Sequence, residues 1–374
     1  MTDTYCRNLV ILWFGTTFLL FLFLPSINLY HETVTLEEVE TVEDLFQTDE
    51  LERYRNEFLY ELGYSGDKGQ VVVGKQQWLF LGDDYENSMA RGRGIRNISP
   101  ERIDEWVRSM ESRQRWLASQ GIGLVFAIAP NKHSVYPEYL PEGVTIASPN
   151  STDRLVATMQ QAGIRTIDGR KLLLHEKERW EYLYNKTNTH WSSVGAYLVY
   201  KKIMLEVRAE ASELNQFIDL PLSGFKQTRT NPSGLARLLK ISRYLGPKSD
   251  YGYSPPKHSG VADKLCLEVF TSYSIPRAEC KPSANRILPV FSTKYVVNNE
   301  QGVNDGTVLL IRDSFGNAIS TLMNSTFTKS VQVHHRHTAS EVNFKKIIQM
   351  ETPKVVIYIV AERSLFSRSF YSFR

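Results

Sequence analysis

The hydrophobic pattern of the chain opens with residues 9–24, which contain no charged side chain, and residues 25–30 extend this run to 22 residues. A helix needs about 20 apolar residues to cross a bilayer. A cleaved signal peptide is the alternative, but residues 28–31 (Asn-Leu-Tyr-His) offer no small-x-small cleavage site. We therefore expect an uncleaved signal anchor, a transmembrane helix at residues 9–30. Arg7 favours placing residues 1–8 in the cytoplasm as a short tail.

The next segment, residues 31–66, is acidic with scattered apolar positions. It predicts a helical stalk that leads away from the membrane. Two short apolar runs then follow, at residues 71–73 and 78–81, on either side of Gly-Lys-Gln-Gln. This pattern predicts a β-hairpin.

Helical and strand-like spacings alternate through the rest of the chain. Ser99 and Pro100 predict a helix start, because Ser caps well and Pro suits the first turn, and Gly121 predicts its end. Residues 123–129 form a continuous apolar run, typical of a strand covered on both faces. Further helices are expected at about 152–162, 169–178 and 193–208, and strands at 164–167, 308–311, 331–333 and 355–360.

This alternation favours an α/β fold in which helices flank a mainly parallel sheet over residues 67–374. Residues 210–305 interrupt the alternation, and we expect an irregular insertion there with one short helix near 233–243. Insertions of such length usually carry function or mobility.

Composition and charge narrow the class of protein. The 42% hydrophobic content excludes wholesale disorder, and three cysteines are too few for a disulfide-built scaffold. Residues 1–52 carry ten acidic side chains and one basic side chain, so the remainder carries 43 basic and 31 acidic ones, a net charge of +12. A net positive charge on this larger part of the chain favours anionic partners. Nothing resembles a nucleic-acid-binding module, and we expect no nucleic-acid partner.

The three cysteines fit an exported body. Cys6 precedes the anchor, on the reducing side of the membrane, whereas Cys266 and Cys280 follow it. A disulfide between Cys266 and Cys280 would contribute about 3 kcal/mol in the chain-entropy model. The alternative is two separate buried thiols.

The first position with candidate chemistry is Ser314, which follows the strand expected at 308–311 and precedes a predicted helix. Open α/β folds place their ligands at the carboxyl ends of sheet strands. A serine there could act as a nucleophile beside helix N-terminal amides that favour an oxyanion. The alternative is that Asp313 or Ser314 only caps the helix.

His190 is the second candidate, because it lies just before the helix expected at residues 193–208. A serine hydroxyl is a poor nucleophile without a base, and a histidine is the usual base. The alternative is a structural or surface histidine.

Weaker candidates surround these two. Lys132 and Tyr136 follow the apolar strand at 123–129 and could face the same cleft, or could be a capping or solvated pair. Arg312 could bind a uronate carboxylate, although arginines at strand ends are more often paired structurally. His334, His335 and His337 show no helical metal-binding spacing, and we expect no metal site.

In combination, these motifs resemble the alginate O-acetyltransferase family (AlgJ/AlgX-like), part of the SGNH-hydrolase-like group. The resemblance covers roughly residues 70–366, and the histidine motif precedes the serine motif as in that family. The matching segments are Asn-Thr-His-Trp at 188–191 and Leu-Leu-Ile-Arg-Asp-Ser-Phe-Gly at 309–316, with further matches within 74–80, 130–141 and 362–365.

The resemblance implies an SGNH-hydrolase-like acetyltransferase domain over residues 67–374. Ser314 would carry the acetyl group as an acyl-enzyme, and His190 would first take the serine proton and then activate a sugar hydroxyl. The family also implies a bacterial protein held in the inner membrane by one helix, with its catalytic domain in the periplasm. A multi-spanning membrane O-acyltransferase of the MBOAT type would supply acetyl groups that originate from cytoplasmic acetyl-CoA, so no bound cofactor is expected.

One residue departs from the family pattern. The family usually has Asp two residues before the histidine, where this chain has Asn188. In a serine protease, the corresponding Asp→Asn change lowers turnover about 10⁴-fold. Three explanations stay open: Asn188 orients His190 through its carbonyl oxygen, Asp313 substitutes as the acid, or the chain is a weak or inactive relative.

Three functions follow from these observations. The leading one is acetyl transfer to hydroxyls of an exported polysaccharide, for which the basic body favours an anionic polymer. A carbohydrate acetyl esterase would use the same Ser314 and His190, with water as the acceptor. A non-catalytic scaffold that binds the polymer and the membrane acyltransferase is the alternative from another class, and Asn188 is its supporting feature.

Overall fold

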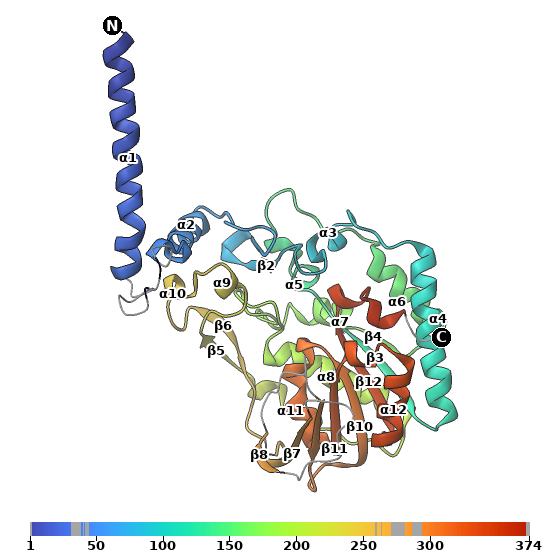
Figure 1. Cartoon of the computed structure of the whole chain (residues 1–374). Coiled ribbons are helices and arrows are strands. Elements are labelled where there is room, and N and C mark those ends of the chain that lie inside the picture. The colour runs from blue at the N-terminus through green and yellow to red at the C-terminus, as the bar shows by residue number, and fades with distance from the viewer. Residues whose placement is uncertain are drawn as a thin grey trace.

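A computed structural model of the chain shows one N-terminal helix beside an α/β body (Figure 1). The residues that it describes are 2–30, 39, 41, 45–258, 260–262, 264–270, 281–285 and 294–371. The helices are α1 (Thr2–Tyr30), α2 (Asp49–Glu61), α3 (Ser88–Gly92), α4 (Pro100–Ser119), α5 (Lys132–Val135), α6 (Ser151–Gln161), α7 (Gly169–Glu176), α8 (Ser193–Glu210), α9 (Leu235–Leu238), α10 (Ser242–Leu245), α11 (Asn317–Thr326) and α12 (Glu341–Glu351). The strands are β1 (Val71–Val73), β2 (Leu79–Leu81), β3 (Gly123–Ala129), β4 (Thr166–Asp168), β5 (Lys226–Thr230), β6 (Asp250–Ser254), β7 (Lys264–Phe270), β8 (Lys281–Ala284), β9 (Lys294–Asn298), β10 (Asn304–Arg312), β11 (Phe327–His334) and β12 (Val355–Ala361).

The main sheet has eight strands in the order β4-β3-β12-β10-β11-β9-β7-β8. The first five run parallel, and β9, β7 and β8 extend the sheet with antiparallel pairing. The predicted α/β fold with a mainly parallel sheet is therefore confirmed. The predicted hairpin is also present, as the antiparallel pair β1–β2.

Both faces of the parallel strands are buried. In β3, Val125 and Ala127 pack into a core that includes α8 and α11, whereas Leu124 and Phe126 pack into a second core that includes α4, α6 and α12. This two-sided burial explains why the strand is apolar at every position rather than at alternate ones.

Residues 210–305, expected to be irregular, instead contain regular structure. They include the antiparallel pair β5–β6, the short helices α9 and α10 between these two strands, and the three antiparallel strands of the main sheet. Cys266, in β7, is disulfide-bonded. Cys280 lies outside the described residues, so the pairing of these two cysteines stays a prediction.

The apolar N-terminal helix is present as α1. Its portion Val10–Tyr30 has a mean hydropathy of 2.1 and is long enough to cross a membrane. The helix α2 lies within residues 31–66, where a helical stalk was expected. It packs on the body instead of standing apart from it. Tyr60 joins a small apolar core with the β1–β2 hairpin and α9, and Asn56 Nδ2 donates to the carbonyl oxygen of Leu239 at 2.9 Å.

Candidate active site

Ser314 lies at the carboxyl end of β10, near the middle of the sheet. Asp313 shapes this turn, because its Oδ1 accepts from the Phe315 N–H at 2.9 Å and its Oδ2 accepts from the Ala361 N–H at 2.7 Å. Ser314 then opens a single 3₁₀ turn that continues into α11. The turn holds the serine at the sheet edge where α/β folds bind ligands.

A second loop carries His190 to the same edge. Buried Asp250 anchors this loop by accepting from the backbone N–H groups of Lys186 at 3.0 Å and Thr187 at 2.8 Å. Trp191 Nε1 donates to the carbonyl oxygen of Phe315 at 3.0 Å, which ties the histidine loop directly to the serine turn.

The two loops bring Ser314, His190 and Asn188 into one line of hydrogen bonds. His190 Nε2 lies 2.8 Å from Ser314 Oγ, and His190 Nδ1 lies 3.1 Å from Asn188 Oδ1. These are the distances that a serine nucleophile and its base require.

The orientation of the Asn188 amide is fixed from both ends. Its Oδ1 accepts from the His190 backbone N–H at 3.1 Å, and its Nδ2 donates to Ser233 Oγ at 2.9 Å. An oxygen facing Nδ1 favours the tautomer with its proton on Nδ1, which leaves Nε2 free to accept the serine proton. Asn188 therefore occupies the position of an orienting acid. Asp313 does not, because its oxygens serve Phe315 and Ala361.

His190 is held neutral. Burial lowers its pKa to about 4, the positive charge of Arg363 acts in the same direction, and Asp313 opposes them. A neutral imidazole at neutral pH is the form that a general base needs.

A pocket of about 380 Å³ opens over Ser314 and has largely polar and charged walls. Its charged side chains include Glu86, Arg336 and Arg363, with an Arg336 guanidinium nitrogen 3.9 Å from Glu86 Oε1. The Arg363 guanidinium lies over the Phe315 ring, 5.3 Å from its centre. The pocket thus offers charges of both signs and hydrogen-bonding groups beside the reacting serine.

Arg312, a candidate for substrate binding, is fully buried beneath this pocket instead. Its Nε donates to Gln332 Oε1 at 2.7 Å, and its Nη1 donates to Asn317 Oδ1 at 2.5 Å. Burial lowers the pKa of Arg312 to about 10, which still leaves it charged at neutral pH. Asn317 also lines the pocket, and because its oxygen accepts from Arg312, its NH₂ group is the side-chain donor that remains.

Lys132 and Tyr136 do not join the serine pocket. Lys132 Nζ donates to the carbonyl oxygens of Leu79 and Lys186, each at 2.8 Å, and burial lowers its pKa to about 7. The buried Tyr136 hydroxyl donates to the Glu181 carbonyl oxygen at 3.0 Å and accepts from the Leu183 N–H at 2.9 Å. Both residues hold together the loops around the site.

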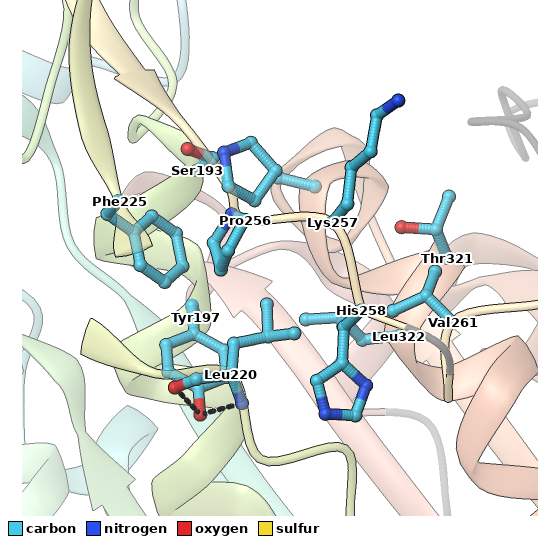
Figure 2. A pocket seen from close by; sticks show the side chains of 12 residues that line it. Ser193, Tyr197, Leu220, Phe225, Pro256, Lys257, His258, Val261, Thr321 and Leu322 are labelled. Atoms are coloured by element: carbon cyan, nitrogen blue, oxygen red, sulfur yellow. Dashed lines mark hydrogen bonds between the residues drawn. The ribbon is translucent and has the colours of Figure 1, made fainter. Parts of the chain in front are cut away.

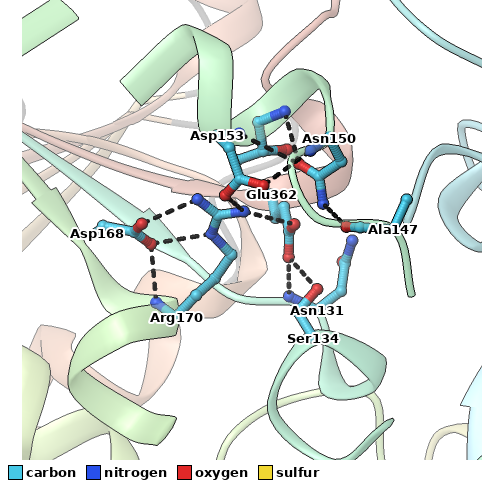
Figure 3. Close-up of polar contacts among 9 residues, drawn as sticks. Asn131, Ser134, Ala147, Asn150, Asp153, Asp168, Arg170 and Glu362 are labelled. Carbon is cyan, nitrogen blue, oxygen red and sulfur yellow. Dashed lines mark hydrogen bonds and ion pairs between the residues drawn. The ribbon is translucent and has the colours of Figure 1, made fainter. Parts of the chain in front are cut away.

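A buried ionic network fixes three strand ends beside the pocket (Figure 3). Arg170 pairs with Asp168 at 2.8 Å and Asp153 at 2.9 Å, and lies 3.8 Å from Glu362. Glu362 also accepts from the Asn131 N–H at 2.9 Å and the Ser134 hydroxyl at 2.7 Å. The network joins the carboxyl ends of β3, β4 and β12 and so positions Arg363, which follows Glu362.

Among the residues that the structure describes, no group of three or more His, Cys, Asp or Glu side chains is placed to hold a metal ion. His334 and His335 line the serine pocket without forming such a group. Burial lowers the pKa of each to about 3.

Sequence reasoning missed several residues of the site. Asn317 could have been found, because it lies three residues after Ser314 at the start of the same helix. Ser233 and Glu86 could not, because they lie far along the chain in segments with no recognisable motif.

A larger cavity of about 590 Å³ is lined in part by residues of α8 and α11 (Figure 2). Its lining is mostly apolar and includes Tyr197, Leu220 and Phe225, with Lys257 and His258 among its polar members. Neither Ser314 nor His190 reaches it, so the smaller polar pocket is the candidate active site.

Comparison with known proteins identifies similar families and folds. Residues 71–251 match the family model described as "SGNH hydrolase-like domain, acetyltransferase AlgX". This region contains His190 and Asn188, whereas Ser314 lies beyond it.

Two curated relatives are probable alginate O-acetylases AlgJ. The one from Pseudomonas aeruginosa is 29% identical over 187 residues, 49% of this chain and 44% of the relative. The one from Azotobacter vinelandii is 30% identical over 146 residues, 37% of this chain and 34% of the relative. The chain thus matches less than half the length of these relatives.

Solved structures share the fold across most of the chain. Bacillus cereus PatB1 superposes with a TM-score of 0.60 at 14% identity, covering 81% of this chain and 99% of PatB1. A DHHW family protein from Eubacterium siraeum gives a TM-score of 0.54 at 14% identity, covering 82% and 96%. Residues 71–251, just under half of the chain, are thus similar to the AlgX/AlgJ family of SGNH hydrolase-like acetyltransferases.

Proposed function

We propose that this protein is an O-acetyltransferase that moves acetyl groups onto hydroxyls of an exported polysaccharide through an acetyl-Ser314 intermediate. The observation that carries the proposal is the 2.8 Å contact between His190 Nε2 and Ser314 Oγ, with Asn188 oriented behind the imidazole. The kinship with probable alginate O-acetylases supports acetyl as the transferred group.

In the first half-reaction, Ser314 Oγ attacks the carbonyl carbon of an acetyl ester while His190 Nε2 takes the serine proton. The Asn188 oxygen then accepts a charge-assisted hydrogen bond from the imidazolium Nδ1–H. The Asn317 NH₂ group donates a hydrogen bond to the tetrahedral oxyanion, and the positive charge of Arg363 stabilises it. Its collapse breaks the bond to the leaving alkoxide, which takes the proton from His190.

The second half-reaction reverses these roles. His190 removes the proton of a sugar hydroxyl, which attacks the acetyl-serine carbonyl. The tetrahedral intermediate then releases Ser314, and the imidazolium returns the proton to its Oγ. The polar walls of the pocket suit a sugar acceptor, and Arg336 and Arg363 suit an anionic one.

The cellular arrangement belongs to the same proposal. Helix α1 anchors the protein once in a bacterial inner membrane with its N-terminus in the cytoplasm, and the catalytic domain lies in the periplasm. A multi-spanning O-acyltransferase of the MBOAT type supplies acetyl groups that derive from acetyl-CoA. The apolar length of α1 supports the anchor.

An esterase is the second candidate, because the same three residues would deliver the acetyl group to water if water reached the acyl-enzyme. The test is to incubate the full chain with a chromogenic acetyl ester, with and without uronic-acid or neutral oligosaccharides. Acetylated sugar is the expected product. Free acetate alone, at every acceptor concentration, would assign the protein to the esterases. No turnover in either the wild type or Ser314→Ala would support a non-catalytic scaffold.

A further inference from the structure

An apolar stripe runs along α2 on the side that faces away from the body. It consists of Leu51, Tyr54, Phe58 and the capping residue Leu62, at helical spacings of three and four. All four are exposed, and Phe58 is 66% exposed. The opposite side of the same helix buries Asn56 and Tyr60 against the body, so among the described residues the stripe is the exposed side of α2.

The segment just before α2 is tied to α1, at Asn28 near the end of that helix and at Phe21 within its apolar span. The Phe46 ring lies 4.6 Å from the Phe21 ring, and Asn28 Nδ2 donates to the carbonyl oxygens of Leu45 at 2.8 Å and Gln47 at 2.9 Å. Helix α2 begins two residues after Gln47 and therefore lies beside the foot of α1 (Figure 1). Where α1 crosses a bilayer, this foot marks the membrane surface.

We propose that the α2 stripe lies in the interfacial layer of the membrane that α1 crosses, and that lipid is its partner. The inference rests on the membrane anchor of the proposed function. Leucine, phenylalanine and tyrosine are the side chains that interfacial helices present to lipid, with the tyrosine hydroxyl at the headgroups.

Most charged side chains of α2 are paired, and the Arg53 guanidinium lies over the Tyr54 ring of the stripe, 4.1 Å from its centre. Arg53 bonds both Glu50, at 2.5 Å, and Glu57, at 2.6 Å. Lys240 pairs with Asp49 and Glu52. The helix can therefore approach a bilayer without presenting a row of uncompensated carboxylates to it.

This placement would bring the catalytic edge of the sheet to the membrane side. Asn56 of α2 bonds the Leu239 carbonyl, the Leu235 N–H donates to Thr187 O at 2.9 Å, and Ser233 of the same segment holds Asn188. In Figure 1, β2 and α5, which follows β3, lie along the same edge of the body as α2. An acetyl donor presented from the membrane would therefore meet Ser314 without crossing the body.

The test measures the depth of the stripe in lipid. The full chain with Cys6→Ser, and no further change, is the labelling background. Phe58→Cys and Leu62→Cys carry a nitroxide in phosphatidylethanolamine/phosphatidylglycerol nanodiscs. Val342→Cys is the matched control, because Val342 is 74% exposed on α12 of the body. Collision rates with oxygen, which enters lipid, and with a water-soluble nickel chelate report the surroundings of each label.

We expect both stripe labels to collide severalfold more with oxygen than with the chelate, and the Val342 label to show the reverse. If the stripe labels collide with the chelate as often as the control label does, the proposal is overturned. That result would mean that the stripe faces water, either permanently or until a protein partner binds it. Turnover of the chromogenic ester by the same samples reports the catalytic function separately, so a failure of one proposal is distinguishable from a failure of the other.

Discussion

The role of Asn188 gives the sharpest prediction, because replacing it in two ways should move activity in opposite directions. In Asn188→Ala, the imidazolium formed in the transition state loses its acceptor at 3.1 Å. A hydrogen bond to a charged group contributes about 1.5–3 kcal/mol. At roughly 1.4 kcal/mol per factor of ten, kcat/KM should fall about 10- to 150-fold.

Asn188→Asp should raise kcat/KM instead. A carboxylate acceptor makes a hydrogen bond roughly twice as strong as a neutral one, which predicts about a tenfold gain. It also favours the charged imidazole, so the pKa of His190 should rise above its value of about 4.

The assay is steady-state release of the chromophore from an acetyl ester, with the folded state of each variant checked by circular dichroism. Thr189→Ala is the matched control, since that side chain makes no described hydrogen bond to His190 or Ser314, and we expect a change within about twofold. An Asn188→Ala enzyme as active as the wild type would refute the orienting role. A folded Asn188→Asp enzyme slower than the wild type would refute the claim that charge at this position is limiting.

Three further predictions follow from the same geometry. Because catalysis requires neutral His190, whose pKa is about 4, kcat/KM should rise with pH through about 4 and stay level from pH 6 to 8. A rise in kcat/KM centred near pH 6.5 would contradict a buried base that is neutral at that pH. Asn317→Ala should lower kcat about 10²- to 10³-fold with little change in KM if its NH₂ group stabilises the oxyanion, and an effect on KM alone would assign it to substrate binding. Arg170→Met should lower the free energy of unfolding by about 3–5 kcal/mol, because it leaves buried carboxylates unpaired. Glu362→Gln should lower it by only about 1 kcal/mol, because burial already raises the pKa of that carboxyl. Thermal unfolding in detergent compares the two variants, and equal losses would contradict the network.

Much of the fold could be predicted because continuous apolar runs are visible in the sequence. The runs at 123–129 and 355–360 became β3 and β12, since strands buried on both faces leave no room for polar positions. The apolar run before Ser314 predicted its place at a strand end, whereas His190 was predicted just before a helix and was paired with Ser314 by the family resemblance; the two lie 2.8 Å apart. The antiparallel strands β7, β8 and β9 were missed because polar residues such as Glu268 and Lys294 interrupt them, so they form no continuous apolar run.

The supporting residues of the site could not be predicted, because their roles depend on where long side chains turn. Arg312 follows an apolar strand and was a candidate for substrate binding, but it turns inward to Gln332 and Asn317. Lys132 likewise turns toward two backbone carbonyls. Sequence position shows that such a residue is near the site but not whether it faces substrate or supports the residues that do.

The central claim, that Ser314 carries the acetyl group, is tested most directly by rapid quenching of the enzyme during ester turnover, followed by intact-protein mass spectrometry and peptide mapping. The account predicts one acetyl group per chain, on the peptide that contains Ser314, and none in Ser314→Ala. In His190→Ala, its formation should be far slower. Turnover by an enzyme that never acquires acetyl at Ser314, or acquires it equally well on another residue in Ser314→Ala, would contradict the account.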